Sequence, residues 1–154
     1  MKKTKAIEIL DKLGVPFEVR SFEATEFTAE EGAQKMGLPP SEVWKTLVAR
    51  GERKGVVMAI IPGPCSLSMR KLANTIGDKR AEMVDVSELM RLTGYLKGGC
   101  SPLGGRRDYP IYIDATIHQY GRVSISAGLR GLQILITPAD LIRVTQAVVA
   151  DLIE

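Results

Sequence analysis

The stretch of residues 94–105 constrains the fold more than any other part of this sequence. It reads Gly-Tyr-Leu-Lys-Gly-Gly-Cys-Ser-Pro-Leu-Gly-Gly, with five glycines and one proline in twelve residues. Glycine weakens the interior of helices and strands, and proline fixes one backbone angle and lacks an amide hydrogen. Neither regular element accommodates so many of these residues, so the sequence predicts a shaped loop.

A loop of this kind can bind a ligand or can merely connect two elements. Glycines with positive φ bring backbone amides close to a ligand, which suits an anion or a carbonyl group. The alternative is a solvent-exposed turn. The loop is not a Walker motif, because no Lys-Ser or Lys-Thr pair ends it, and it lacks the GxGxxG spacing of a dinucleotide site.

Hydrophobic periodicity and turn residues predict the elements around this loop. The expected helices cover residues 4–13, 28–36, 68–76, 85–93 and 137–152, and the second begins with a capping box formed by Thr28 and Glu31. The expected strands cover residues 17–22, 47–49, 56–61, 82–84, 110–113, 123–127 and 132–136. The last strands are too close in sequence for helical crossovers between all of them. We therefore expect an α/β fold of the α+β type, with a mixed, partly antiparallel sheet.

Length and composition favour one globular domain over residues 1–154. Apolar residues make up 45% of the chain and charged residues 25%, as in ordinary globular proteins. The longest apolar run covers residues 55–61, far short of the roughly 20 residues that cross a bilayer. The basic N-terminus is not followed by the apolar segment of a signal peptide. We expect a cytoplasmic protein without a membrane span.

The sequence offers few ligands for a metal. It has two cysteines, Cys65 and Cys100, no CxxC motif and one histidine, His118. These cannot supply three or four soft ligands, so we expect no metal and no cofactor. The two thiols could pair if the fold brought them together, but a cytosolic setting favours free thiols. No serine in the sequence is an evident partner for His118, which favours a structural or surface role for this histidine.

Lys45 lies between Trp44 and Thr46, at the point where we expect a turn to end and a strand to begin. Partial burial there favours a functional amine, whereas the alternative is an ordinary solvated lysine. Arg106 and Arg107 directly follow the glycine-rich loop, in a chain of net charge +3. They can contact phosphates, but a solvated charged surface explains them equally well.

Four segments together resemble a known family. They are Val43-Trp-Lys-Thr-Leu47, Gly94-Tyr-Leu-Lys-Gly-Gly-Cys-Ser-Pro-Leu-Gly104, Ile113-Asp114 and Ser126-Ala-Gly-Leu-Arg-Gly-Leu132. In this order they resemble the YbaK/EbsC family of trans-editing aminoacyl-tRNA deacylases, which is related to the editing domain of bacterial prolyl-tRNA synthetase. The resemblance spans nearly the whole chain. It implies a mixed or barrel-like sheet surrounded by helices.

The resemblance also implies a set of site residues. Lys45 matches the essential lysine of the family and is the expected catalytic residue. The expected substrate-binding residues are Thr46, Gly98, Gly99, Ser101, Pro102, Gly104, Ser126 and Gly128. Two positions depart from the family pattern: Cys100 stands where an aliphatic residue is expected, and Gln133 where relatives often carry an acidic residue that concerns the substrate's amino group.

Within the family, a threonine after the lysine is similar to the branch that clears cysteine from tRNA. The resemblance therefore implies hydrolysis of Cys-tRNA(Pro), and also of Cys-tRNA(Cys), in which the substrate's own thiol attacks its carbonyl carbon. One alternative is a deacylase for Ala-tRNA(Pro) or another small aminoacyl-tRNA, and a further one is a non-catalytic module that binds tRNA or a synthetase. The acceptor end of aminoacyl-tRNA is the expected partner, and prolyl-tRNA synthetase is a candidate second partner.

Overall fold

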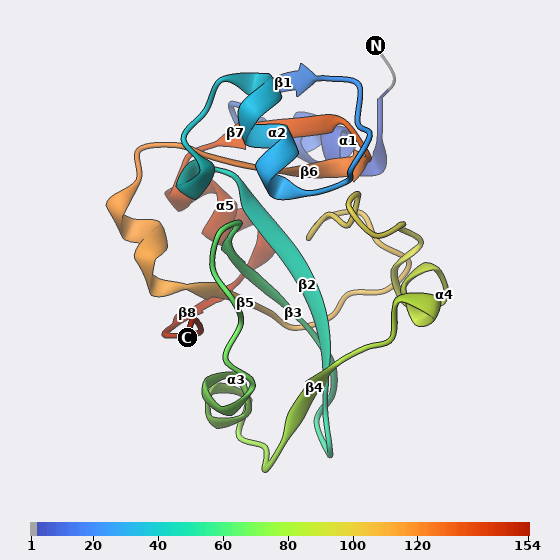
Figure 1. The fold of residues 1–154 in the computed structure, drawn as a ribbon, viewed down its shortest axis with the longest axis vertical. Helices are drawn as coiled ribbons and strands as arrows, with labels where there is room; N and C mark the ends of the chain where they lie inside the picture. The colour runs from blue at the N-terminus through green and yellow to red at the C-terminus, as the bar shows by residue number, and fades with distance from the viewer. Residues whose placement is uncertain (1–2) are drawn as a thin grey trace.

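The computed structural model describes residues 3–154 and arranges their strands in two sheets (Figure 1). A five-stranded mixed sheet has the order β4-β2-β3-β5-β8, and a three-stranded antiparallel sheet has the order β1-β7-β6. The strands are β1 (Glu18–Ser21), β2 (Trp44–Gly51), β3 (Gly55–Pro62), β4 (Ala81–Met83), β5 (Ile111–Asp114), β6 (Val123–Leu129), β7 (Leu132–Ile136) and β8 (Val148–Ala150).

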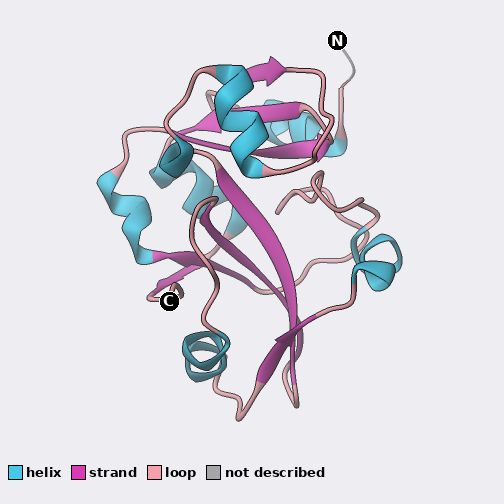
Figure 2. Cartoon of the chain, in the orientation of Figure 1, coloured by secondary structure: helices cyan, strands magenta, loops and turns pink. Residues whose placement is uncertain are grey.

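Helices surround the sheets, as Figure 2 shows. Within residues 3–154 the α-helices are α1 (Lys5–Leu13), α2 (Ala29–Met36), α3 (Met69–Ile76), α4 (Leu89–Thr93) and α5 (Pro138–Thr145), and the 3-10 helices are η1 (Pro40–Glu42), η2 (Val86–Glu88) and η3 (Ala115–Gln119). None of the helices in these residues is both long and apolar enough to cross a bilayer. The expected α/β fold with a mixed sheet and surrounding helices is confirmed.

The β2–β3 hairpin is the part of the fold that the sequence predicts most directly. Its strands pair antiparallel from Trp44 opposite Pro62 to Gly51 opposite Gly55. Strand β3 lies at the centre of its sheet, with β2 antiparallel on one side and β5 parallel on the other. The continuous apolar character of residues 56–61 follows from this position, because a central strand is covered on both faces.

The predicted last helix is too long. Helix α5 ends at Thr145, because Gln146 takes a left-handed conformation with φ 55°. The next residues form strand β8, which pairs parallel with β5. Val148, which lies inside the range expected for this helix, is 54% exposed. Two consecutive β-branched valines at 148 and 149 favour a strand, and the spacing of apolar residues alone did not reveal it.

Two further details differ from the prediction. The segment expected as one helix over residues 85–93 starts as the 3-10 helix η2 and continues as α4, with both bonds of the capping box between Asp85 and Glu88 present. The strands divide between two sheets, which strand spacing does not indicate. A parallel bridge between Val43 and Ser124 joins the start of β2 to β6. The two sheets therefore meet at the beginning of β2.

Candidate functional site

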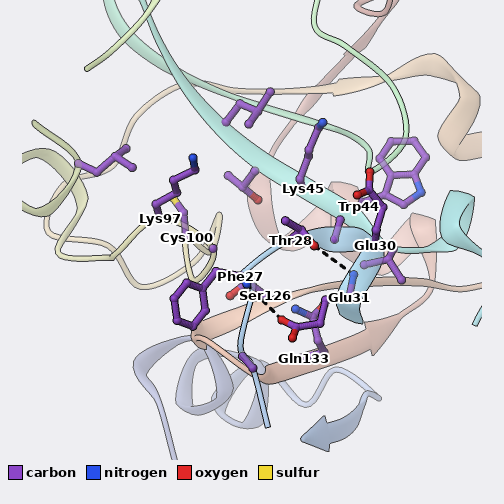
Figure 3. A pocket seen from close by; sticks show the side chains of 18 of the residues that line it. Phe27, Thr28, Glu30, Glu31, Trp44, Lys45, Lys97, Cys100, Ser126 and Gln133 are labelled. Atoms are coloured by element: carbon purple, nitrogen blue, oxygen red, sulfur yellow. Dashed lines mark hydrogen bonds between the residues drawn. The ribbon is translucent and has the colours of Figure 1, made fainter. Parts of the chain in front are cut away.

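A pocket of about 380 Å³ lies where the beginning of β2 meets the three-stranded sheet. Its walls come from β2, the segment before α2, the glycine-rich loop, the β4 region and the facing strands β6 and β7 (Figure 3). Its apolar lining includes Phe22, Phe27, Val43, Trp44, Leu47, Val48, Met83, Val84, Val86 and Leu89, and its charged lining includes Glu30, Glu31, Lys45 and Lys97. An apolar cleft with a few polar groups is the usual form of a ligand site.

Lys45 is the second residue of β2, half-buried and opposite Ile61 of β3. Trp44 before it is buried, and its indole N–H donates to the Ser41 carbonyl at 3.0 Å. Within residues 3–154, no carboxylate lies within ion-pair distance of the Lys45 ammonium. The rigid hairpin thus holds a cation at the pocket wall whose charge is available to a ligand.

Thr46 follows Lys45 and also lines the pocket. Among residues 3–154, its Oγ1 is the one buried side-chain nitrogen or oxygen atom without a hydrogen-bond partner. A buried polar group left unpaired costs about 1–3 kcal/mol, and a ligand that bonds to it removes this cost. The unpaired hydroxyl is therefore a feature that a bound substrate would explain.

Hydrogen bonds within the glycine-rich loop and from the β6–β7 turn fix the conformation of this loop. The Tyr95 hydroxyl donates to the Leu103 carbonyl at 2.5 Å, and burial raises the pKa of Tyr95 to about 12. The Gly99 amide donates to the Leu96 carbonyl at 2.9 Å, and Arg130 Nε donates to the Lys97 carbonyl at 2.8 Å. These bonds hold the segment that presents Gly98 to the pocket.

The expected site residues fall into two groups. The pocket lining brings together Lys45, Thr46, Gly98 and Ser126. The remaining expected residues, Gly99, Ser101, Pro102, Gly104 and Gly128, do not line this pocket. Their packing supports the local backbone, since it leaves no room for larger residues at some of these positions.

Three of these supporting residues show the packing. The Ser101 side chain is fully buried, and its Oγ accepts the Leu103 amide at 3.2 Å. A Cβ atom at Gly104 would lie 2.8 Å from Lys5 Cβ, and one at Gly128 would lie 2.9 Å from Tyr95 Cε1. Close contacts at these three positions therefore restrict the conformation of the loop and of its neighbours.

Gly98 allows the loop to approach the segment before α2. It has φ +84°, and a Cβ there would lie 2.6 Å from Phe27 Cβ and 2.7 Å from the Phe27 carbonyl oxygen. We expect Gly98→Ala to destabilise the protein by about 1–3 kcal/mol through backbone strain and to displace Phe27 from the pocket wall. Urea unfolding measures the first effect, and hydrogen exchange at the Phe27 amide measures the second.

Gly121→Ala is the matched control, because no heavy atom lies within 4 Å of a Cβ at that position and its φ is outside the left-handed range. We expect it to change stability by less than about 0.5 kcal/mol. If Gly98→Ala behaves like Gly121→Ala in both assays, the approach of the loop to Phe27 has no role.

Ser126 and Gln133 face each other across the β6–β7 ladder and both line the pocket. Ser126 Oγ accepts the Gly128 amide at 3.1 Å. The buried Gln133 accepts the Ser124 hydroxyl on its Oε1 at 2.7 Å. An amide oxygen has two lone pairs, so Gln133 keeps one acceptor position for a ligand.

The pocket offers no activated side-chain nucleophile among the residues that line it. Burial raises the pKa of the Cys100 thiol to about 12, so this thiol stays protonated and unreactive near neutral pH. His118, in η3, is exposed and is not part of the pocket lining, which leaves Ser126 without a histidine base. We therefore expect the nucleophile of any reaction in this pocket to come from the substrate or from water.

Two other features bear on binding. Arg106 lines a second hollow on the other side of the glycine-rich loop, together with Lys3 and Lys5, whereas Arg107 is exposed outside both hollows. Among residues 3–154 no group of three or more His, Cys, Asp or Glu side chains is arranged to hold a metal ion. Arg106, Lys3 and Lys5 thus lie beside the pocket, whereas Lys97 of the loop lines it.

Several pocket residues were not expected from the sequence. Glu31, assigned to a capping box, lines the pocket together with Phe22 and Phe27. Lys97 and Cys100 belong to the predicted loop but were not nominated as site residues. Gln133 was noted in the sequence only as a departure from the family pattern, and strand alternation was a second signal for it, because it places that side chain on the same face as Ser126 in a hairpin.

Comparison with known proteins identifies the family. The family model of the aminoacyl-tRNA editing domain matches residues 23–144. EbsC of Enterococcus faecalis, named as a proposed Cys-tRNA(Pro)/Cys-tRNA(Cys) deacylase, is 35% identical over 153 residues, which cover 98% of this chain and 93% of EbsC. Proline–tRNA ligase of Thermosipho africanus is 34% identical over 77 residues, 50% of this chain and 14% of the ligase.

A solved structure extends the likeness to the whole fold. The crystal structure of a protein described as a proposed trans-editing enzyme for prolyl-tRNA synthetase matches with a TM-score of 0.89 and 29% identity. The match covers 100% of this chain and 99% of that one. The family model, the match to EbsC over nearly its full length and the solved structure all agree. The chain belongs to the aminoacyl-tRNA editing domain family.

Proposed function

We propose that this chain hydrolyses the ester bond of mischarged aminoacyl-tRNA, with Cys-tRNA(Pro) as its preferred substrate and Cys-tRNA(Cys) as a second one. The observation that carries the proposal is that Lys45, Thr46, Gly98 and Ser126 line one pocket in a member of the editing family. The name of EbsC supports cysteine as the amino acid, and the likeness to proline–tRNA ligases supports tRNA(Pro).

The pocket fits the 3′ end of a tRNA rather than its duplex stem. At about 380 Å³ it lies at the small end of the range for ligand pockets, enough for an aminoacyl group and part of a nucleoside. The apolar wall with Phe27 and Trp44 suits flat and apolar groups, while the cations of Lys45 and Lys97 suit the ribose-phosphate chain.

The polar groups have distinct roles in this proposal. The Lys45 ammonium stabilises the negative charge that develops on the ester carbonyl oxygen in the transition state. The free lone pair of Gln133 Oε1 accepts a hydrogen bond from the substrate's amino group. Gly98 lets the loop backbone lie close to the aminoacyl group, and the Thr46 hydroxyl bonds the substrate.

The substrate's thiol supplies the nucleophile. Its sulfur attacks the carbonyl carbon of the same cysteinyl group, a C–S bond forms, and the bond between that carbon and the ribose oxygen breaks. The thiol proton passes to the ribose oxygen, so tRNA leaves with a free hydroxyl. Water then opens the four-membered thiolactone to cysteine. This route needs no activated protein nucleophile, in agreement with the protonated Cys100 thiol and with the absence of His118 from the pocket lining.

The Thr46→Val variant tests whether the Thr46 hydroxyl binds the substrate, because the substitution should slow hydrolysis without destabilising the protein. It removes the unpaired hydroxyl, so we expect the variant to be as stable as the wild type or more stable by up to about 1–3 kcal/mol. Hydrolysis should fall roughly 2- to 10-fold, the value of one ordinary hydrogen bond. Urea unfolding and initial rates measure this, and a variant with full activity would show that the hydroxyl does not meet the substrate.

A panel of charged tRNAs tests the substrate assignment. We expect the purified protein to deacylate Cys-tRNA(Pro) and Cys-tRNA(Cys) well and to leave Pro-tRNA(Pro) intact, because proline has no thiol. Preference for Ala-tRNA(Pro) would identify an alanine deacylase. Tight binding of tRNA without hydrolysis of any member would identify a binding module. We further propose that the enzyme acts in the cytoplasm and that prolyl-tRNA synthetase delivers its substrate.

A further inference from the structure

Glu31 is the most heavily engaged carboxylate of the pocket lining. Its oxygens accept the backbone amides of Thr25 at 2.8 Å, Glu26 at 3.1 Å and Phe27 at 3.1 Å, and also the Thr25 hydroxyl. Its side chain pairs with Lys35 at 3.2 Å. The Thr25 bonds, with those from Glu26 and Lys35, lower the pKa of Glu31 to about 2, so it is ionised at neutral pH.

These bonds are not those of the predicted capping box. Thr28 Oγ1 does accept the Glu31 amide at 3.1 Å and caps α2. The Glu31 carboxylate, however, turns to the three residues before Thr28, as the dashed line to Phe27 in Figure 3 shows. We call the segment of residues 22–28 the strap. One residue of α2 therefore fixes the strap independently of the helix cap.

The strap is held in a conformation that a free chain avoids. Phe27 has φ 61°, a left-handed value that is costly for a bulky residue. Its carbonyl and Cβ lie where a side chain on Gly98 would stand. Its ring lies under the Arg130 guanidinium, with 3.8 Å between Arg130 Cζ and the ring centroid. The strap thus meets the glycine-rich loop and the β6–β7 turn through Phe27.

The start of the strap is anchored as well. The Phe22 amide donates to the Gly131 carbonyl at 2.8 Å, in the same β6–β7 turn. Phe22, Ala24 and Phe27 all line the pocket, so the strap forms a continuous wall. Between Phe22 and Thr28, the strap backbone is fixed by Glu31, which accepts three consecutive amides, and by Lys35, whose ammonium donates to the Glu23 carbonyl.

We propose that Glu31 is a positioning residue for the aminoacyl-tRNA pocket: it holds the strap so that Phe27 closes the pocket wall against Gly98 and Arg130. Glu31 does not touch the reacting atoms in this scheme, and it acts through Phe27. The catalytic part of the inference rests on the proposed deacylase function, whereas the structural part does not.

Glu31→Gln tests the proposal while keeping the helix cap, because the amide that Thr28 binds is unchanged. A glutamine offers one acceptor oxygen and two N–H donors to a cluster of donors, so the strap should lose its fixed conformation. We expect faster hydrogen exchange at the Thr25, Glu26 and Phe27 amides. The Gly32 and Leu38 amides, which bond inside α2 and its C-cap, should stay protected.

The kinetic readout distinguishes positioning from catalysis. With Cys-tRNA(Pro), Glu31→Gln should raise KM roughly 10-fold and leave kcat within about twofold, because binding and not the reacting groups is changed. The Kd for the non-hydrolysable probe 3′-deoxy-3′-(cysteinylamino)adenosine should rise by the same factor. In a Phe27→Ala background, Glu31→Gln should add less than about twofold to KM, since coupled residues are not additive.

Asp78→Asn is the matched control. Asp78 accepts the Arg53 and Lys54 amides at 2.9 and 2.8 Å and so fixes another loop in a similar way, away from the pocket lining. We expect exchange to rise at Arg53 and Lys54 while KM and kcat stay unchanged. Thr25→Val, which removes one donor and keeps the carboxylate, serves as a milder variant if Glu31→Gln does not fold.

Three results of these experiments would overturn the positioning role of Glu31. Protected strap amides in both strap variants, or additive effects of Glu31→Gln and Phe27→Ala on KM and Kd, would overturn it. A rise in KM after Asp78→Asn would also overturn it, since general destabilisation would then explain the effect. If the wild type binds the probe but hydrolyses no charged tRNA, the proposed function fails, and exchange and probe affinity still decide the role of Glu31.

Discussion

Replacing Lys45 by alanine should abolish most of the deacylase activity while leaving the fold intact. Among residues 3–154 the ammonium in the pocket wall has no carboxylate within ion-pair distance, so its removal takes away charge without breaking an ion pair of these residues. Loss of one electrostatic contact to a developing oxyanion commonly costs about 2.7–4 kcal/mol, a factor of about 10²–10³ in rate. Initial rates of hydrolysis of Cys-tRNA(Pro), with thermal unfolding as the folding check, measure the effect.

Two further variants define the role of this charge. Lys45→Arg should also lose most of its activity, because a planar guanidinium is bulkier and directs its donors differently from a compact ammonium. Lys12→Ala, which removes an exposed lysine of α1, should leave the rate unchanged. Turnover within a few-fold of wild type after Lys45→Ala would show that the site has been assigned to the wrong residue.

Exchange of the substrate's sulfur for oxygen should have the second large effect. A thiol near neutral pH is ionised by a few per cent, whereas a serine hydroxyl is almost never ionised. If the substrate thiol is the nucleophile, Cys-tRNA(Pro) should be deacylated at least roughly 10²-fold faster than Ser-tRNA(Pro). Parallel single-turnover assays with both tRNAs measure the ratio.

Methylation of the sulfur sharpens this experiment. S-methylcysteinyl-tRNA(Pro) keeps the sulfur and adds volume but has no ionisable thiol, so it should react as slowly as Ser-tRNA(Pro). Competition for hydrolysis of Cys-tRNA(Pro) shows that the analogue still binds. Comparable rates for cysteinyl and seryl substrates would rule out the thiol route and point to attack by water.

The elements with strong local signals could be predicted from the sequence. Thr28, Ser68 and Thr137 cap helices at the expected positions, and the charged turn between residues 50 and 55 closes the expected hairpin. Strand β8 could not be predicted, because its few residues continued the apolar spacing of α5. The separation into two sheets depends on long-range contacts such as the bridge between Val43 and Ser124. Local sequence patterns do not indicate contacts of this kind.

The candidate site shows the same division. The motif around Lys45 and the glycine-rich loop indicated two walls of the pocket, and both line it through Lys45 and Gly98. The third wall, formed by the strap, was missed because Glu31 matched a capping-box pattern that explained it locally. Its carboxylate instead bonds residues 25–27, and only the folded backbone reveals that choice.

The central claim is that this pocket is an editing site for cysteine on tRNA(Pro). The most direct test is the single-turnover release of radiolabelled cysteine from Cys-tRNA(Pro), with the protein in excess over tRNA and the spontaneous release measured alongside. We expect first-order release at least roughly 10²-fold above the spontaneous rate, with the tRNA left intact and chargeable. Release at the spontaneous rate by the folded wild-type protein would contradict it.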